Sequence, residues 1–97
     1  MAEIQTPDVV ATYCDEIDDV RAKAGAFEFY VDKSGTVAGM IYACPCGCGA
    51  TGALAFKPAP SPSWAWDGNR EKPTLHPSVH HVGHWHGWLQ DGVWKSC

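Results

Sequence analysis

Residues 36–49 read TVAGMIYACPCGCG, an apolar run followed by three closely spaced thiols, Cys44, Cys46 and Cys48. The apolar run predicts a β-strand that ends where the thiols begin. Thiols this close together do not bridge one another without strain, but as thiolates they converge readily on one soft divalent ion. We therefore expect a strand that delivers a metal site at its end. We call Cys44, Cys46 and Cys48 the cluster thiols.

Further metal-binding residues lie near the end of the sequence, at His84, His86 and Cys97. Four-coordinate zinc needs only four donors, so more are present than one ion requires. We predict that Zn²⁺ is held by two or three cluster thiols together with His84 and Cys97. The Cys-x-Cys-x-Cys spacing differs from the usual Cys-x-x-Cys knuckle, which leaves an iron–sulfur cluster or inert buried thiols as alternatives.

Patterns typical of β-structure lie on both sides of the cluster. Residues 27–31 are aromatic and β-branched, and turn residues at 32–35 separate them from the next apolar run, so the two runs predict a hairpin. Shorter strands are expected at 8–13, 52–56, 64–66 and 74–82. Three prolines within residues 57–62 predict an extended surface loop, because proline donates no hydrogen bond to a sheet.

A second hairpin is predicted around Asp91-Gly92, a pair suited to a type I′ turn. Closing the chain there pairs Cys97 near residue 86 and places its sulfur beside the imidazoles of His84 and His86. Together these segments predict a mostly β fold, a small curled antiparallel sheet or partial barrel, with one short helix over residues 15–24.

Length and charge restrict the class of protein. The 97 residues predict a single zinc-binding β domain spanning 1–97, with a small core that a metal would help to stabilise. A net charge of -4 with only 7 Lys and Arg argues against nucleic-acid binding through phosphates.

Residues 1–5 do not resemble a signal peptide, and the apolar run 37–44 is too short to cross a membrane. We expect a cytoplasmic protein with reduced thiols.

Four motifs together resemble a family of small phage and bacterial proteins. They are Cys44-Pro45-Cys46-Gly47-Cys48-Gly49, Trp64-x-Trp66-Asp67-Gly68-Asn69, Lys72-Pro73-Thr74-Leu75-x-Pro77-Ser78 and Trp85-His86-Gly87-x-Leu89-x-Asp91-Gly92. Phage members of that family carry an unsupported label, "ammonia monooxygenase". Bacterial relatives lie in operons for ubiquitin-like conjugation, where they are thought to act as zinc-containing serine peptidases on the ubiquitin-like protein. The resemblance covers residues 40–97.

The resemblance implies roles for two residues. The family's serine after Thr-Leu-x-Pro matches Ser78, and its histidine matches His86, which makes them a candidate nucleophile and general base. The family has a cysteine just before this histidine that is missing here, and His84 is a suitable replacement as a zinc ligand. Asp67 and Asp91 are interpreted as turn residues rather than as the acid that orients the base.

Three functions are therefore compared. The first is a small zinc-stabilised peptidase or isopeptidase that acts on the tail of a ubiquitin-like or other protein, in the host cytoplasm if a phage encodes it. The second is a non-enzymatic structural zinc domain, a phage adaptor or an inhibitor of a host protein. The third makes the zinc itself catalytic, with one position open to water. All three expect a protein partner or substrate.

Overall fold

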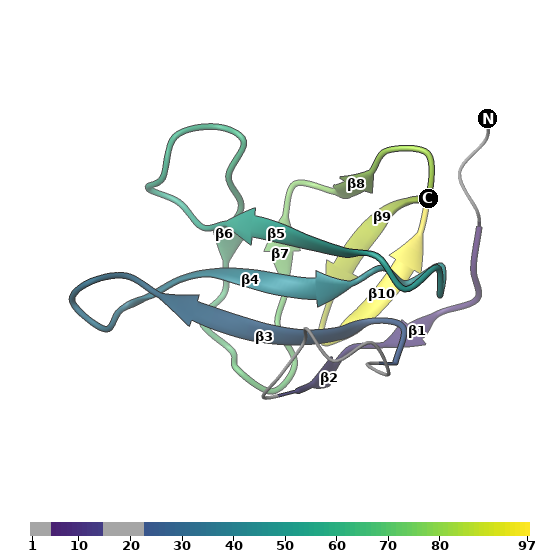
Figure 1. Cartoon of the computed structure of the whole chain (residues 1–97), viewed down its shortest axis with the longest axis horizontal. Coiled ribbons are helices and arrows are strands. Elements are labelled where there is room, and N and C mark those ends of the chain that lie inside the picture. Colours follow the sequence, from purple (N-terminus) through teal and green to yellow (C-terminus); the bar gives the residue numbers. More distant parts are fainter. Residues whose placement is uncertain (1–4, 15–22) are drawn as a thin grey trace.

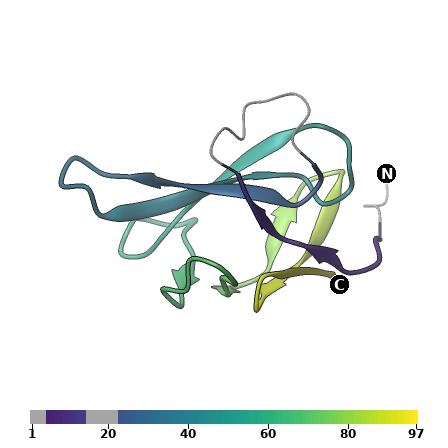
Figure 2. The same ribbon diagram turned by 90° about the horizontal axis from the view of Figure 1, so that it is seen from below.

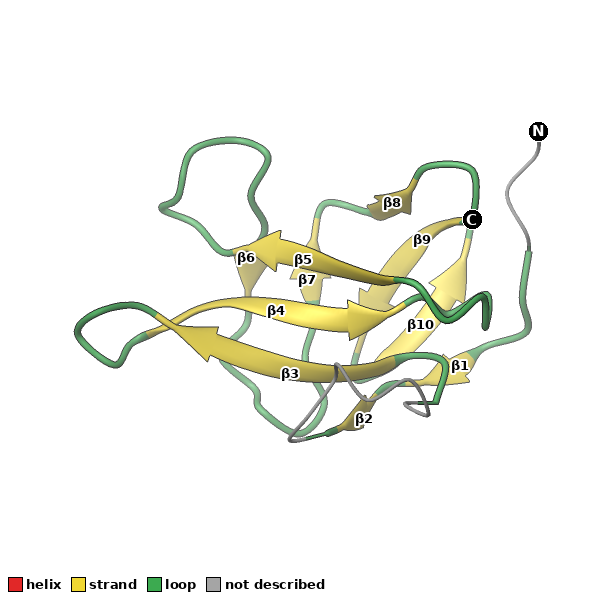
Figure 3. Cartoon of the chain, viewed as in Figure 1, coloured by secondary structure: helices red, strands yellow, loops and turns green. Residues whose placement is uncertain are grey.

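The computed structural model describes residues 5–14 and 23–97, and these residues form strands joined by turns and loops (Figures 1 and 3). One four-stranded sheet has the order β1-β10-β9-β8, with bounds Val9–Val10, Val93–Ser96, Trp85–Gln90 and Val79–His81. A second has the order β2-β3-β4-β5, with bounds Thr12–Tyr13, Ala26–Val31, Val37–Ala43 and Thr51–Ala55. A two-stranded ribbon pairs β6 (Ala65–Trp66) with β7 (Leu75–His76).

We call the two larger sheets the β8–β10 sheet and the β3–β5 sheet. They pack against each other. In Figure 1 the β3–β5 sheet lies in front of β9 and β10. The view from below shows the N-terminal segment, in purple, passing from β10 to β3 (Figure 2). This agrees with the pairing, because β1 is antiparallel to β10 and β2 is parallel to β3. The segment containing β1 and β2 therefore links the sheets.

The core is formed by inward-facing residues of both sheets. Phe27, Met40 and Tyr42 come from the β3–β5 sheet, and Trp85 and Trp94 from the β8–β10 sheet. Side chains alternate between faces along a strand, so the neighbours of these residues point outward. Trp85 and Trp94 are fully buried as expected for large apolar groups, whereas Trp88 faces outward and is half-buried. The core thus lies between the sheets, and one face of β8, β9 and β10 remains outside it.

The predicted hairpins are confirmed. β3 pairs with β4 around the turn at residues 32–35, and β9 pairs with β10 around Asp91-Gly92. Asp91 and Gly92 have φ angles of 48° and 73°, the left-handed values that a type I′ turn requires. The fold is mostly β, as expected, but the sheets are not closed into a barrel.

Two predicted strands are divided in the structure. The segment 74–82 becomes β7 and β8, separated at the cis His76–Pro77 bond, and these strands pair with β6 and β9 respectively. The segment 8–13 becomes β1 and β2, which join different sheets. Most of the helix expected at 15–24 lies outside the described residues. Among the described elements, no helix is long and apolar enough to span a membrane.

Candidate functional site

The cluster thiols occupy the turn between β4 and β5. Their ligand atoms all lie within 4.8 Å of one another, although Cys44 is buried and Cys48 is exposed. The turn is closed by hydrogen bonds from the Cys44 amide to the Ala50 carbonyl (2.9 Å) and from the Gly47 amide to the Cys44 carbonyl (3.0 Å). Gly47 adopts a φ of 84°, a conformation that costs a residue with a side chain. The local backbone therefore folds the thiols around one point.

The protonation of these thiols depends on their surroundings. Burial raises the pKa of Cys44 to about 12, and its Sγ donates a hydrogen bond to Cys46 Sγ at 3.3 Å. For Cys48, slight burial opposes ionisation, but hydrogen bonds from the Ala50 amide and the neighbouring thiols outweigh it and lower the pKa. The three thiols hydrogen-bond to one another and supply soft sulfur donors. They therefore fit a metal ion of the zinc class, which would replace the thiol protons.

His84 and Cys97 lie outside this group of three donors. Strand alternation explains why Cys97 lies apart from the cluster thiols. Its amide donates to the His86 carbonyl at 3.0 Å, so it lies opposite His86, on the face away from buried Trp94. Cys44 points the other way, into the core. His84 lies in the turn before β9, where its ring is 4.7 Å from that of His81.

Ser78 and His86 meet on the outer face of the β8–β10 sheet. Ser78 Oγ lies 3.0 Å from His86 Nε2, within hydrogen-bond distance. Ser78 immediately precedes β8, and His86 is the second residue of β9, the strand paired with β8. The Ser78 carbonyl accepts a hydrogen bond from Trp64 Nε1 at 3.2 Å, which fixes the backbone that carries the hydroxyl. Both side chains are half-buried.

A second imidazole lies against His86. His80 is the direct cross-strand partner of His86, and the two rings are 4.6 Å apart with an angle of 33° between their planes. His80 and His81 both belong to β8, which lies within the segment 74–82 that was expected to form a strand. The pairing of His80 with His86 follows if the β9–β10 hairpin is extended by one more antiparallel strand, β8, beside β9.

Asp67 and Asp91 both take part in turn hydrogen bonds, as interpreted from the sequence. Asp67 Oδ1 accepts hydrogen bonds from the amides of Asn69 (3.0 Å) and Thr74 (3.3 Å). The Asp91 amide donates to Thr74 Oγ1 at 2.9 Å, at the tip of the β9–β10 hairpin.

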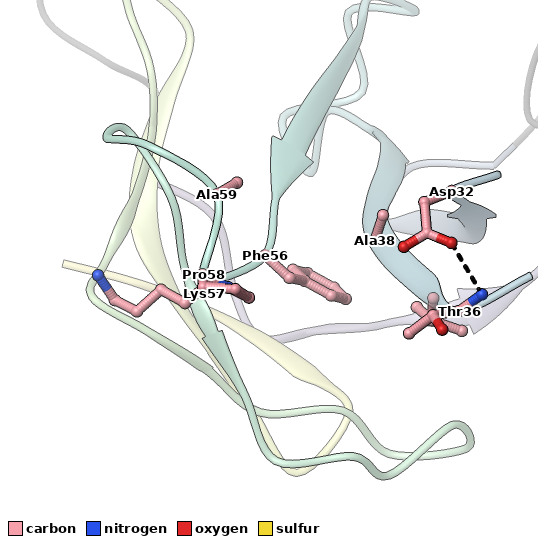
Figure 4. Close-up of a pocket in the computed structure, with 8 residues that line it drawn as sticks. Asp32, Thr36, Ala38, Phe56, Lys57, Pro58 and Ala59 are labelled. Atoms are coloured by element: carbon pink, nitrogen blue, oxygen red, sulfur yellow. Dashed lines mark hydrogen bonds between the residues drawn. The ribbon is translucent and has the colours of Figure 1, made fainter. Parts of the chain in front are cut away.

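Two hollows lie away from both groups. One, of about 360 Å³, lies between Phe56 with its following loop and the turn where Asp32 accepts a hydrogen bond from the Thr36 amide (Figure 4). The other, of about 400 Å³, includes Phe29 and Arg70 in its lining. The described residues lining them belong to neither the cluster nor the Ser78–His86 pair.

Comparison with known proteins identifies a family. The model of the family described as bacterial ubiquitination-like system serine protease (BubE) matches residues 13–97. No curated protein and no solved structure matches the chain. The matched span contains the cluster thiols, Ser78 and His86.

Proposed function

The chain belongs to the family of bacterial ubiquitination-like system serine proteases, and on that premise we propose that it cleaves a peptide or isopeptide bond with Ser78 as nucleophile and His86 as general base. The observation that carries the proposal is the 3.0 Å contact between Ser78 Oγ and His86 Nε2. A serine hydroxyl becomes a useful nucleophile when a base at this distance accepts its proton.

The proposed reaction needs His86 in the tautomer with its proton on Nδ1, which leaves Nε2 free to accept. Ser78 Oγ attacks the substrate carbonyl carbon as its proton moves to Nε2. The amine leaves with that proton, and the serine ester that remains is hydrolysed by water, activated by the same imidazole. Ser78 is half-buried and immediately precedes β8, the outermost strand of the β8–β10 sheet. An extended substrate chain can therefore approach the Ser78 hydroxyl along this edge.

The substrate we propose is the tail of a ubiquitin-like protein. The family description, which names a ubiquitination-like system, supports a protein substrate. An extended, flexible tail suits this site, because the nucleophile immediately precedes β8, the edge strand of its sheet.

We further propose that the cluster thiols hold a structural Zn²⁺. The thiols and the Ser78–His86 pair belong to different sheets, and Cys44 points into the core. A zinc ion there would tie the β4–β5 turn to the core and take no part at the reacting atoms. This separation favours a structural zinc over the catalytic zinc considered from the sequence.

Labelling with a fluorophosphonate probe tests the proposal, with the adduct located by mass spectrometry. The wild-type protein should be labelled at Ser78, and both Ser78→Ala and His86→Gln should abolish labelling and cleavage of a ubiquitin-like fusion. Ser61→Ala, which removes an exposed loop hydroxyl, is the matched control and should react normally. If a folded Ser78→Ala protein still cleaves, the serine mechanism is wrong.

A further inference from the structure

Three metal-competent residues occupy matching positions on neighbouring strands of the β8–β10 sheet. His80 is directly opposite His86 in the β8–β9 register. Cys97 is opposite His86 on the other side, because it follows the Ser96–Gly87 pair and its amide donates to the His86 carbonyl. We call Cys97, His86 and His80 the donor row.

All three side chains of the donor row lie on the outer face. Their neighbours Val79, Gly87 and Trp85 are buried, so alternation places His80 and His86 on the opposite side. His80 and Cys97 are exposed and His86 is half-buried. Directly opposite residues in a sheet have β-carbons about 4.5–5.5 Å apart, a spacing that two ligands of one ion can span.

We propose that the donor row is a second metal site, separate from the cluster thiols, that binds a divalent transition metal of the zinc and nickel class and thereby inhibits the Ser78–His86 pair. Two imidazoles and one thiol form a mixed nitrogen and sulfur set that such borderline ions prefer. Among the described residues only the cluster thiols already converge. The donor row therefore closes by rotation of its exposed side chains, and it binds more weakly than the cluster does.

The inhibition follows from the chemistry of imidazole, and it rests on the proposed function of His86. A neutral imidazole that binds a metal through one nitrogen carries its proton on the other. Binding through Nε2 displaces the Ser78 hydroxyl, and binding through Nδ1 puts a proton on Nε2. In either case His86 no longer accepts the serine proton. The metal is an inhibitor whichever nitrogen it uses.

The experiment uses zinc-loaded protein titrated with Ni²⁺, with zinc content measured before and after. Wild-type protein should bind one further ion per chain in calorimetry. His80→Ala and Cys97→Ser should each weaken this binding by about tenfold or more, because each removes a metal ligand. His76→Ala, which removes another exposed imidazole outside the donor row, should bind as tightly as wild type. Both affected positions are exposed, and circular dichroism checks that the variants fold.

The same titration is followed by the rate of fluorophosphonate labelling. Ni²⁺ should slow labelling of the wild-type protein at concentrations that leave His80→Ala unaffected. Equal Ni²⁺ binding by wild type, His80→Ala and Cys97→Ser would overturn the metal site. Binding that depends on the row without slower labelling would overturn the inhibition. If Ser78 is never labelled but binding depends on the row, the metal site stands and the proposed serine protease function fails.

Discussion

At the scale of single residues, Gly87 determines how closely β9 approaches β10 beside the proposed base. A β-carbon at this position would meet the Lys95 carbonyl oxygen and the Trp85 indole. One of these is backbone and the other is fixed in the core, so neither gives way cheaply. The absence of a side chain at position 87 therefore allows β9 to lie this close to β10.

Gly87→Ala should destabilise the protein by about 3 kcal/mol or more, because it forces a clash against backbone in a packed core. Gly35→Ala is the control: its β-carbon would meet open space, and the cost there is only the left-handed φ of 87°, about 1 kcal/mol. Urea denaturation of both variants measures the difference. Equal losses for the two variants would mean that the close approach at Gly87 does not restrain the strands.

Asp32 organises the β3–β4 turn. Its Oδ1 accepts hydrogen bonds from the Ser34 hydroxyl (2.7 Å) and from the amides of Ser34 (2.9 Å) and Thr36 (3.1 Å). These bonds favour the carboxylate, with the Ser34 hydroxyl the largest cause, and they lower the pKa of Asp32 from 3.8.

Because the pKa of Asp32 is lower in the folded state, its contribution to stability is present above pH 3.8 and is lost as the pH falls through the folded value. Asp32→Asn should therefore lower the melting temperature slightly at pH 7, and the difference from wild type should vanish in strong acid. NMR titration of the Asp32 carboxyl carbon gives the pKa directly. A value at or above 3.8 would contradict the role of the turn hydrogen bonds.

Residue types were predictable from the sequence, whereas which residues meet depended on register. The cluster thiols are close in sequence, so their convergence follows from one turn. The contact between Ser78 and His86 requires that β8 pair with β9. Pro77 interrupts the segment 74–82, so the alternation of residues there does not predict this pairing. Cys97 was expected to join the cluster, but strand alternation turns its side chain to the other face.

At the scale of elements, the β4–β5 turn is the part of the fold that depends most on the proposed ion. It holds few apolar side chains beyond Cys44, and its glycines at 47 and 49 have left-handed φ angles in open space. Glycines of this kind lose much conformational entropy on folding, so a bound ion would add to the stability that the turn's backbone hydrogen bonds provide.

Purified protein should contain about one zinc per chain, and chelation should lower the free energy of unfolding by several kcal/mol, because the energy of metal binding contributes to folding. Cys48→Ser should reduce both the zinc content and the stability. Cys14→Ser is the matched control, since that thiol packs against Ala26 and Ala43 and is not one of the three converging thiols, and it should keep its zinc. Full zinc in Cys48→Ser protein would remove Cys48 from the ligand set.

Longer elements were predicted better than short ones. The hairpins of β3 with β4 and of β9 with β10 have long apolar runs and clear turn residues, so local pattern identifies them. β1, β2 and β7 are two-residue strands, and the partner of β1, strand β10, lies at the other end of the sequence. A two-residue strand has no periodicity to detect, and only tertiary packing decides its sheet.

At the scale of the whole molecule, Trp94 joins the two sheets. It lies on β10, and its ring is 5.3 Å from that of Tyr42 on β4 and 5.7 Å from that of Trp85 on β9. Its indole Nε1 donates a buried hydrogen bond to the Gly25 carbonyl at 2.9 Å, just before β3. The sheets therefore share one core and should unfold together.

Trp94→Phe should destabilise the protein by about 2–4 kcal/mol, since it removes buried volume and leaves the Gly25 carbonyl without its donor. Trp88→Phe makes the same exchange on the adjacent strand, but on the outer face, where a surface substitution should cost below about 1 kcal/mol. Urea unfolding is followed by circular dichroism and by fluorescence. Within each protein, wild type or variant, the two probes should give the same midpoint, because neither sheet has a core without the other. Equal costs for the two substitutions would contradict the role of Trp94 in the shared core, and separate transitions would show that the sheets are stable independently. The outer face of β8–β10, with Ser78 and His86, would then be held by its own sheet alone rather than by the shared core.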